Sequence, residues 1–179
     1  MTEILDGKEL LPDPAITLRR LEKVDDRWVI KAEGGTAAAC PVCGMVSSAR
    51  HSNYQRHLRD LPLQGRTVRI QLGVGRWRCG DACCHRRIFC ERLPNVASKF
   101  ARETCRFSEV VDLLGYALGG RPGERLGGRL GFPVSDDTLL RRIKKTARLR
   151  SPSGPVPIIG VDEWAGRKGY GGYGTILVD

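Results

Sequence analysis

The spacing of apolar residues changes period along the chain, and this change separates strand-like from helix-like regions. In residues 16–33, single apolar side chains alternate with polar ones before and after the pair Asp25-Asp26. Alternation with a period of two is typical of a strand with one buried face, and paired aspartates favour a turn. The pattern predicts a β-hairpin whose apolar positions include Ile16 and Trp28.

A longer strand is predicted over residues 66–78. Its apolar side chains stand at even positions from Val68 to Val74, but the next large one, Trp77, stands at an odd position. A one-residue bulge moves every later side chain to the other face of a strand. We therefore expect a β-bulge near Gly73 or Gly75, within a small antiparallel β module.

The region that follows these strands repeats its apolar side chains every three or four positions, as helices do. A first helix is predicted to begin at an N-cap Ser108 and to end at Gly119-Gly120. A short second helix is predicted to start at Pro122 and to stop at Gly131. Its apolar positions, one turn apart, are Leu126 and Leu130.

A third helix is predicted to begin at an N-cap Ser135, with Asp136 and Asp137 in its first turn, where negative charge suits the helix dipole. One side is apolar (Leu139, Leu140, Ile143, Ala147) and the other is polar or basic (Thr138, Arg141, Arg142, Lys145). A short helix, a tight turn with glycine and a basic helix together predict a helix-turn-helix. The alternative is a helical bundle with a solvated basic face.

The rest of the chain predicts a linker and a second hairpin. Residues 148–157 are rich in proline, glycine and serine, which favours a linker, and two apolar runs on either side of a glycine-rich loop follow. The expected organisation is an N-terminal hairpin region at 1–39, a cysteine-bearing module at 40–94, three helices at 95–150, a linker at 151–157 and a hairpin at 158–179. The expected fold class is α+β.

Basic residues are concentrated in the middle of the chain. The 179 residues carry a formal net charge of +10, and 23 of the 30 basic side chains are arginine. Residues 40–107 hold +9 and residues 108–150 hold +4, whereas both flanking regions are slightly acidic. Because guanidinium groups match phosphates and guanine edges, this surplus favours a polyanionic partner over the alternative of a merely solubilising surface. The length argues against a large self-contained enzyme.

The sequence predicts a cytoplasmic protein. No stretch of the sequence is apolar over the roughly 18 residues of a membrane span. The N-terminal residues are acidic, where a signal peptide is basic and then apolar. An odd number of cysteines, seven, argues against a disulfide framework and for metal binding in a reducing compartment.

The cysteines are arranged as two knuckles. Cys40 and Cys43 stand three apart before Gly44, and a second pair follows in which Cys79 is joined by Cys83 or Cys84. Two such knuckles separated by a strand predict a zinc ribbon with a structural Zn(Cys)4 site, and spacing leaves both candidates for the fourth ligand open. The alternative is a set of ordinary buried or redox cysteines. Cys90 and Cys105 have no partner at a ligand spacing, and we interpret each as a small buried hydrophobic residue.

Several segments together resemble transposases of the ISL-three family of bacterial insertion sequences. They are CPVCG at 40–44, SSARHSNYQRHLRDLP at 47–62, RWRCGDACCHRRIFCERLP at 76–94, the predicted helix-turn-helix, IIGVDEWAGRKG at 158–169 and YGTILVD at 173–179. The motifs follow the family's order. The resemblance implies a small antiparallel β zinc-ribbon module, then a three-helix helix-turn-helix, then the first β-hairpin of an incomplete RNase H-like DDE nuclease domain.

The family's pattern also implies roles for individual residues. Its second knuckle has cysteines five apart, which implies Cys79 and Cys84 as zinc ligands beside Cys40 and Cys43. Its first catalytic carboxylate falls on Asp162. In an intact nuclease domain a further Asp and Glu would complete a site for two Mg²⁺ ions, so this chain alone is expected to be truncated and to lack strand transfer. The residues expected to contact DNA are Thr138, Arg141, Arg142 and Lys145, with Arg86 and Arg87 beside the second knuckle.

The implied function is recognition of the terminal inverted repeats of an insertion sequence, in double-stranded DNA, for DNA transposition. A homodimer on that DNA is expected, in the cytoplasm of a bacterium in association with the nucleoid, and no membrane partner is expected. The alternative is a stand-alone repressor or accessory factor of the element, built from the same zinc ribbon and helix-turn-helix. A third hypothesis is RNA binding by the zinc ribbon.

Overall fold

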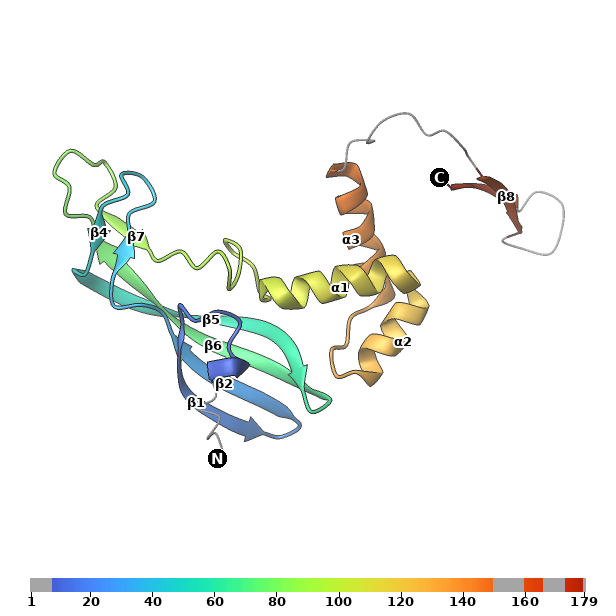
Figure 1. Ribbon diagram of the computed structural model, residues 1–179, viewed down its shortest axis with the longest axis horizontal. Coiled ribbons are helices and arrows are strands. Elements are labelled where there is room, and N and C mark those ends of the chain that lie inside the picture. The colour runs from blue at the N-terminus through green and yellow to red at the C-terminus, as the bar shows by residue number, and fades with distance from the viewer. Residues whose placement is uncertain (1–7, 150–159, 166–172, 179) are drawn as a thin grey trace, which may run out of the picture. The chain divides into compact units, whose positions relative to one another are not determined.

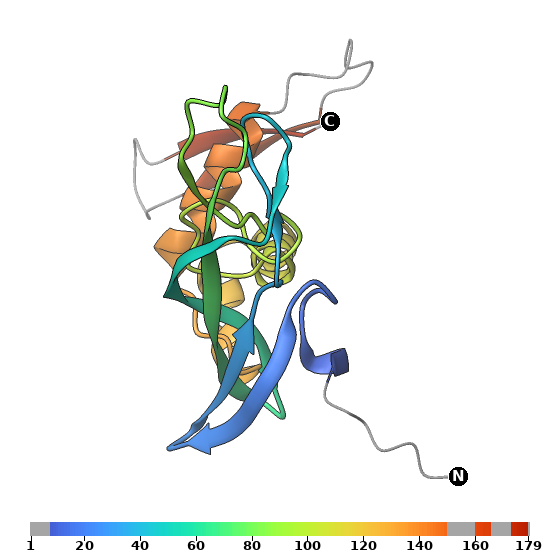
Figure 2. The same cartoon turned by 90° about the vertical axis from the view of Figure 1, so that its left-hand side faces the viewer.

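The computed structural model describes residues 8–149, 160–165 and 173–178 (Figures 1 and 2). The described chain is α+β, with three α-helices and mixed sheets. It divides into two compact units, Met1–Lys144 and Lys145–Asp179. The first unit holds the main sheet, and the second holds a separate hairpin.

The main sheet joins four long strands in the order β1-β2-β6-β5. Their bounds are Thr17–Val24 for β1, Arg27–Glu33 for β2, Arg50–Leu63 for β5 and Arg66–Arg78 for β6. The short β7, Ile88–Cys90, pairs with the end of β6, and a 3-10 helix, Lys8–Leu10, precedes β1. Two further short strands, β3 (Ala38–Ala39) and β4 (Val46–Ser47), pair with each other across the first knuckle.

The N-terminal hairpin is confirmed. Strands β1 and β2 pair antiparallel, and the turn residue Asp25 has a φ of 53°, a left-handed conformation that aspartate tolerates better than most residues. A second hairpin, β5–β6, turns at Gln64-Gly65, where both residues have positive φ. Positive φ at two successive residues matches the right-handed twist of the flanking strands.

The prediction of a wholly antiparallel β module is wrong at one strand pair. Strands β2 and β6 pair parallel, with Trp28 beside Val68 and Ala32 beside Leu72. A parallel pair needs a long connection, and here the connection contains the first knuckle and all of β5. Apolar alternation predicts which residues a strand buries, but it contains no signal for the strand's partner or direction.

The predicted β-bulge near Gly73 or Gly75 is also wrong. Strand β6 keeps a continuous register with β5 from Arg69 to Arg76, and the irregularities lie in β5, between Arg50 and Ser52 and between Asp60 and Leu63. The phase of the apolar pattern changes because β6 buries opposite faces at its two ends. Its even positions join the main core, which also contains Ile30 and Leu58, whereas Trp77 joins a second core with Phe89 and two cysteines.

Helix α1, Cys105–Leu118, begins one turn earlier than predicted. Its N-cap is Thr104, whose hydroxyl oxygen accepts a hydrogen bond from the N–H of Phe107 at 3.2 Å. The same hydroxyl donates to the buried carboxylate of Asp60 on β5 at 2.7 Å, and this bond ties the start of the helix to the sheet. Ser108, the predicted cap, lies within the helix, but the helix ends at Gly119 as predicted, with a φ of 70°.

Helix α2, Arg121–Arg129, and helix α3, Asp136–Leu149, occupy the predicted positions. Ser135 caps α3 by accepting a hydrogen bond from the N–H of Thr138 at 3.4 Å. The packing of α2 differs from the expectation, because Leu126 and Leu130 are exposed and the helix buries Gly123 and Gly127 instead. The helical core contains Phe107, Val111, Phe132, Val134 and Leu139.

The second unit contains the predicted C-terminal hairpin. Strands β8, Gly160–Ala165, and β9, Tyr173–Val178, pair antiparallel, with Asp162 beside Ile176. The predicted linker at 151–157 lies outside the described residues. Among the described helices, none has the length and apolar character that crossing a bilayer requires.

Candidate metal centre and nucleic-acid interface

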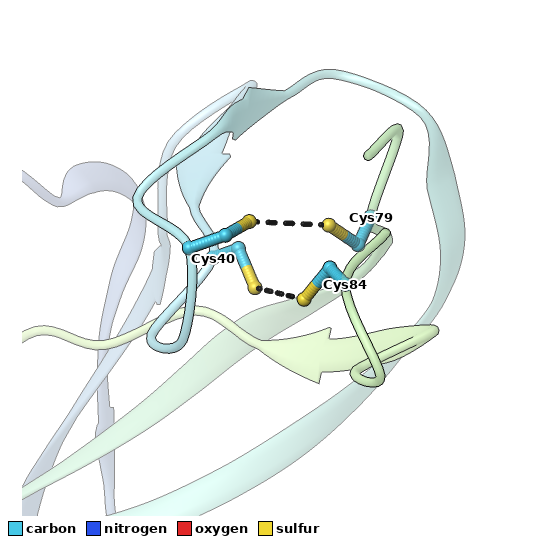
Figure 3. Close-up of side chains that lie close together, drawn as sticks. Cys40, Cys79 and Cys84 are labelled. Carbon is cyan, nitrogen blue, oxygen red and sulfur yellow. Dashed lines mark hydrogen bonds between the residues drawn. The ribbon is translucent and has the colours of Figure 1, made fainter. Parts of the chain in front are cut away.

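Four thiols, two from each knuckle, form a compact group (Figure 3). The Sγ atoms of Cys40, Cys43, Cys79 and Cys84 all lie within 4.8 Å of one another. Two of the distances are 4.0 Å, between Cys40 and Cys84, and 3.5 Å, between Cys43 and Cys79. Tetrahedral zinc with Zn–S bonds of about 2.3 Å separates its sulfurs by about 3.8 Å. The donor set and its spacing therefore fit a structural zinc ion.

Backbone hydrogen bonds hold each knuckle in shape. In the first, the N–H of Gly44 donates to the carbonyl of Cys40 at 2.9 Å, and Gly44 has a φ of 78°, which glycine adopts without strain. In the second, the N–H of Cys79 donates to the carbonyl of Arg87 at 2.9 Å. The N–H of Arg86 points at the Sγ of Cys84, 3.4 Å away.

The structure separates the two candidates for the fourth thiol. Cys84 is buried within the group, whereas the adjacent Cys83 is exposed and lies outside it. The N–H of Cys83 instead donates to the carboxylate of Asp81 at 2.8 Å, which stabilises the turn. Neither Cys90 nor Cys105 belongs to the group. This is the arrangement that the family's pattern implies.

A small aromatic core supports the four thiols. Trp77 and Phe89, paired across β6 and β7, are both 1% exposed and pack with Cys40 and Cys84. The indole ring of Trp77 lies over Gly75, where a Cβ atom would stand only 2.6 Å from the ring nitrogen. Position 75 therefore requires glycine because the tryptophan beneath the thiols occupies that space.

The thiols have unequal acidities. The backbone N–H of Cys43 stabilises the thiolate of Cys40 and lowers its pKa to about 7. At Cys43 the N–H of Met45 acts in the same direction, but burial and the neighbouring thiols outweigh it and raise the pKa to about 12. Ionisation of one thiol therefore makes ionisation of its neighbours less favourable, because the negative thiolates repel one another. A divalent cation relieves this repulsion, since thiolates are the form that binds metal.

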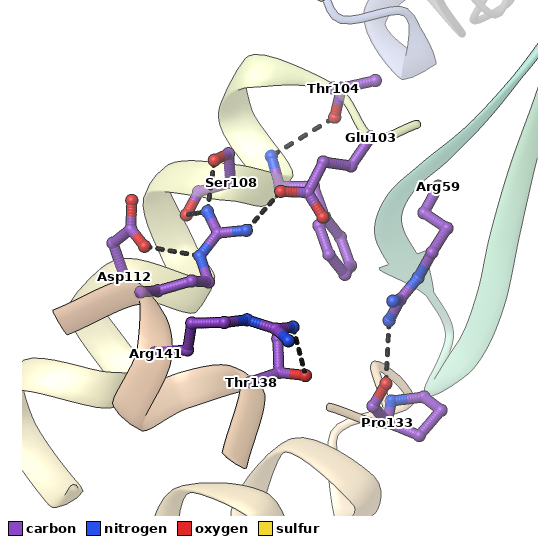
Figure 4. A network of polar contacts seen from close by, with 10 residues as sticks. Arg59, Glu103, Thr104, Ser108, Asp112, Pro133, Thr138 and Arg141 are labelled. Carbon is purple, nitrogen blue, oxygen red and sulfur yellow. Dashed lines mark hydrogen bonds and ion pairs between the residues drawn. The ribbon is translucent and has the colours of Figure 1, made fainter. Parts of the chain in front are cut away.

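The second candidate surface is the exposed side of α3. Of the predicted DNA-contacting side chains there, Arg141 and Lys145 are exposed, and Thr138 is half-buried. The guanidinium of Arg141 approaches the hydroxyl of Thr138 at 3.4 Å (Figure 4). The other two predicted residues, Arg86 and Arg87, are exposed in the second knuckle.

Arg142 has a different environment from Arg141. Its guanidinium donates to the carboxylate of Asp112 at 2.6 Å, to the carboxylate of Glu103, and to the backbone carbonyl of Ser108 at 3.0 Å (Figure 4). The side chain is only 20% exposed, and its pKa is raised because the two carboxylates outweigh the desolvation that opposes them. These contacts join α3 to α1, so they do not favour the predicted contact of Arg142 with DNA.

The predicted catalytic residue lies in the second unit. Asp162 is exposed on β8, and within the described ranges it belongs to no group of potential metal ligands. Sequence reasoning also missed one feature of the first unit, a cleft lined by basic side chains of β5, β6 and residues 86–102. The only signal of this cleft in the sequence was the concentration of arginine, which is spread over strands and loops and therefore specifies no surface.

Comparison with known proteins gives a family match that covers the first knuckle and most of the second. Residues 36–85 match the family described as the zinc-finger of transposase IS204/IS1001/IS1096/IS1165. The matched segment contains all four grouped cysteines. No curated protein and no solved structure matches the chain. The family match confirms the predicted resemblance to the N-terminal part of an ISL-three family transposase.

Proposed function

We propose that this chain, which carries the zinc finger of an ISL-three family transposase at residues 36–85, binds the terminal inverted repeats of its insertion sequence as duplex DNA. One observation carries the proposal: the segment that matches the transposase zinc-finger family contains four thiols, and their sulfurs lie as close together as a zinc ion requires. The basic charge of residues 40–150 supports it, since counterion release from phosphates drives DNA binding.

Zinc has a structural role in this proposal. Four thiolates complete a tetrahedron and leave no open position for a substrate or an activated water. The ion would join the two knuckles, which lie far apart in the sequence and also pack together in the small core around Trp77. Structural zinc in finger peptides contributes about 10–16 kcal/mol of apparent binding free energy at neutral pH.

Helices α2 and α3 act as a helix-turn-helix in this proposal. The short α2, the turn with Gly131 and the capped, basic α3 have the order and lengths of that motif. Arg142 fixes α3 against α1, and Arg141, Lys145 and Thr138 then face the major groove. The exposed Arg86 and Arg87 contact phosphates beside the zinc site, and a second copy of the chain occupies the other half of a repeat.

Strand transfer is not part of the role proposed for the described residues. Cleaving and joining DNA by the DDE mechanism requires several carboxylates around two Mg²⁺ ions, and by resemblance Asp162 supplies one of them. Asp162 lies on β8 of the RNase H-like hairpin that the resemblance implies. The proposed role of residues 8–149 is therefore to position DNA.

A binding assay tests the proposed function. The zinc-loaded protein should bind a duplex from the ends of its element more tightly than a scrambled duplex of equal composition. Arg141→Ala combined with Lys145→Ala should weaken binding about 5- to 150-fold, since a lost base contact costs about 1–3 kcal/mol. The dependence of affinity on salt should also become less steep.

The matched control removes the same charge from β1. The exposed Arg20 and Lys23 lie on that strand, so Arg20→Ala combined with Lys23→Ala should leave DNA affinity close to that of the unchanged protein. Equal binding of both duplexes would contradict repeat recognition, and unchanged affinity of the α3 variant would contradict the recognition helix.

A further inference from the structure

We propose that the basic cleft of the first unit binds an unpaired stretch of DNA, with phosphates on its arginines and one base stacked on Phe100. The cleft is formed by β5, β6 and residues 86–102, a surface separate from α3. The inference extends the proposed function, because it assigns single-stranded DNA to one surface of a chain whose helices bind duplex DNA.

Charge identifies the occupant as a polyanion. The cleft has a volume of about 1180 Å³, larger than the roughly 300–1,000 Å³ of typical small-molecule pockets. Its basic lining residues are Arg56, Arg59, Arg69, Arg76, Arg86, Arg92, Lys99 and Arg102. Among the described residues that line it, Glu91 is the only one with a carboxylate, and this side chain is buried and accepts hydrogen bonds from the N–H groups of Gly35 and Gly75.

Three of these arginines are used within the protein, and one of them, Arg76, lies over the ring of Tyr54, 5.2 Å from its centre. Arg56 donates to backbone carbonyls of the segment that precedes α1, and Arg59 donates to the carbonyl of Pro133 at 2.8 Å. By contrast, Arg69, Arg92 and Arg102 form no side-chain hydrogen bond or ion pair with any residue in the described part of the chain. A groove of uncompensated guanidinium groups fits a phosphate backbone.

The cleft also presents an exposed aromatic ring, on which a base of the proposed DNA strand can stack. Phe100 is 85% exposed, the largest exposed fraction among the large apolar side chains described. It has a φ of 63°, a left-handed conformation that is rare for a bulky residue. The N–H of Ala101 donates to the carbonyl of Ser98 at 3.1 Å, so Phe100 stands at the third position of a turn, where a positive φ favours glycine.

A side chain of strand β5, and not a residue of the turn itself, stabilises this turn. The guanidinium of Arg56 donates to the carbonyl of Ser98 at 3.0 Å and to that of Ala101 at 2.9 Å. One side chain of β5 therefore fixes both ends of the turn and presents the ring of Phe100 outward. Backbone strain that neighbouring groups maintain is typical of binding sites.

The combination of groups favours single-stranded over double-stranded DNA. Stacking needs a base whose face is free, and proteins that bind single strands place aromatic rings along a basic groove. The ammonium of Lys99 lies over one face of the Phe100 ring, 4.8 Å from its centre, so the base stacks on the opposite face of the ring. Arg56 is a positioning residue, whereas Phe100, Arg92 and Arg102 contact the strand.

The test measures binding of the zinc-loaded full chain to a fluorescent single-stranded DNA oligonucleotide of mixed sequence by anisotropy. Phe100→Gly should weaken binding about 5- to 150-fold, the equivalent of one lost stacked base. Phe100→Tyr should keep the affinity within about twofold, because it retains the ring. Arg92→Gln combined with Arg102→Gln should make the salt dependence less steep.

Glycine is the informative substitution because it suits the backbone at position 100, so thermal stability should not fall and lost binding cannot be attributed to unfolding. Affinity for duplex DNA should be unchanged in Phe100→Gly and reduced in Arg141→Ala combined with Lys145→Ala, and this contrast separates the cleft from the proposed function of α3. Unchanged single-strand affinity in Phe100→Gly would overturn the proposal. Much tighter binding of the matching ribonucleotide would overturn DNA as the occupant.

Discussion

Two neighbouring arginines on α3 have different roles, although the helical pattern places both on its polar side. Arg142 is enclosed by groups of α1, and Arg141 is exposed. The sequence contains the partners Asp112 and Glu103, but their distance of some 30 and 39 positions from Arg142 conceals the pairing. Periodicity therefore assigns a side chain to a face, and only the packing of helices decides whether that face is free.

Replacing Arg142 tests this assignment through stability. Arg142→Ala should lower the free energy of unfolding by about 2 kcal/mol, because hydrogen bonds to charged groups contribute about 1.5–3 kcal/mol and two carboxylates would lose their partner. Urea denaturation of the zinc-loaded protein measures the change. Arg141→Ala is the matched control and should stay within about 0.5 kcal/mol of the unchanged protein. Equal effects of the two substitutions would contradict the different roles.

Cysteines were the most predictable residues of the candidate site. The short spacing within each knuckle predicted a pair of ligands, because a knuckle is a local structure, and the need of zinc for four ligands predicted that the two pairs meet. Cys83 and Cys84 could not be distinguished by spacing, since both lie at a distance from Cys79 that a turn can close. The side chain of Asp81 fixes that turn and directs Cys84 inward.

At the scale of elements, glycine rather than leucine determines how α2 packs. A Cβ atom at Gly123 would lie 2.7 Å from the Cδ1 atom of Leu139, which is fully buried on α3. A Cβ at Gly127 would lie 3.1 Å from the carbonyl of Phe132. The two glycines, four positions apart on one face, let the helices approach closely. Leu126 and Leu130, which the apolar pattern places in the core, are therefore left exposed.

Substitution of two glycines of α2 by alanine should have opposite effects on stability. Gly128 has open space where a Cβ would stand, so Gly128→Ala should stabilise the protein by about 0.5–1 kcal/mol through helix propensity. Gly123→Ala gains the same propensity, but overpacking against Leu139 costs about 1–3 kcal/mol, so we expect net destabilisation. Thermal unfolding of the two variants checks the signs. Stabilisation by both would show that α2 is not closely packed.

Elements with strong local signals were predicted well, and those defined by distant partners were not. The hairpin at Asp25 has a turn residue, strand β6 has a regular period of two from Val68 to Val74, and α3 has a cap at Ser135. The cap of α1 was misplaced because Thr104 gains its importance from Asp60, 44 positions away. The parallel pairing of β2 with β6 likewise depends on the whole sheet and not on either strand's pattern.

At the scale of the first unit, two separate cores change the expected response to loss of metal. Only 6% of the residues are aromatic, and in a chain with so few large core side chains we expect a structural zinc ion to support the whole region from 16 to 94. In the structure, however, the main core of Ile30, Leu58 and Ile70 contains no cysteine. The second core, around Trp77, includes two of the thiols and lies on the opposite face of β6. The sheet should therefore retain much of its order without metal.

Hydrogen exchange after chelation measures this difference. With zinc removed, amides of β7 and of both knuckles should lose protection, including Cys79, whose N–H bonds to the carbonyl of Arg87. Amides in the middle of β6, around Ile70, should remain protected because the main core still covers them. Cys84→Ser should reproduce the chelated pattern, whereas Cys83→Ser, at the exposed neighbour, should not. Loss of protection along the whole of β6 would mean that the two cores unfold as one cooperative unit, and zinc would then support the entire sheet.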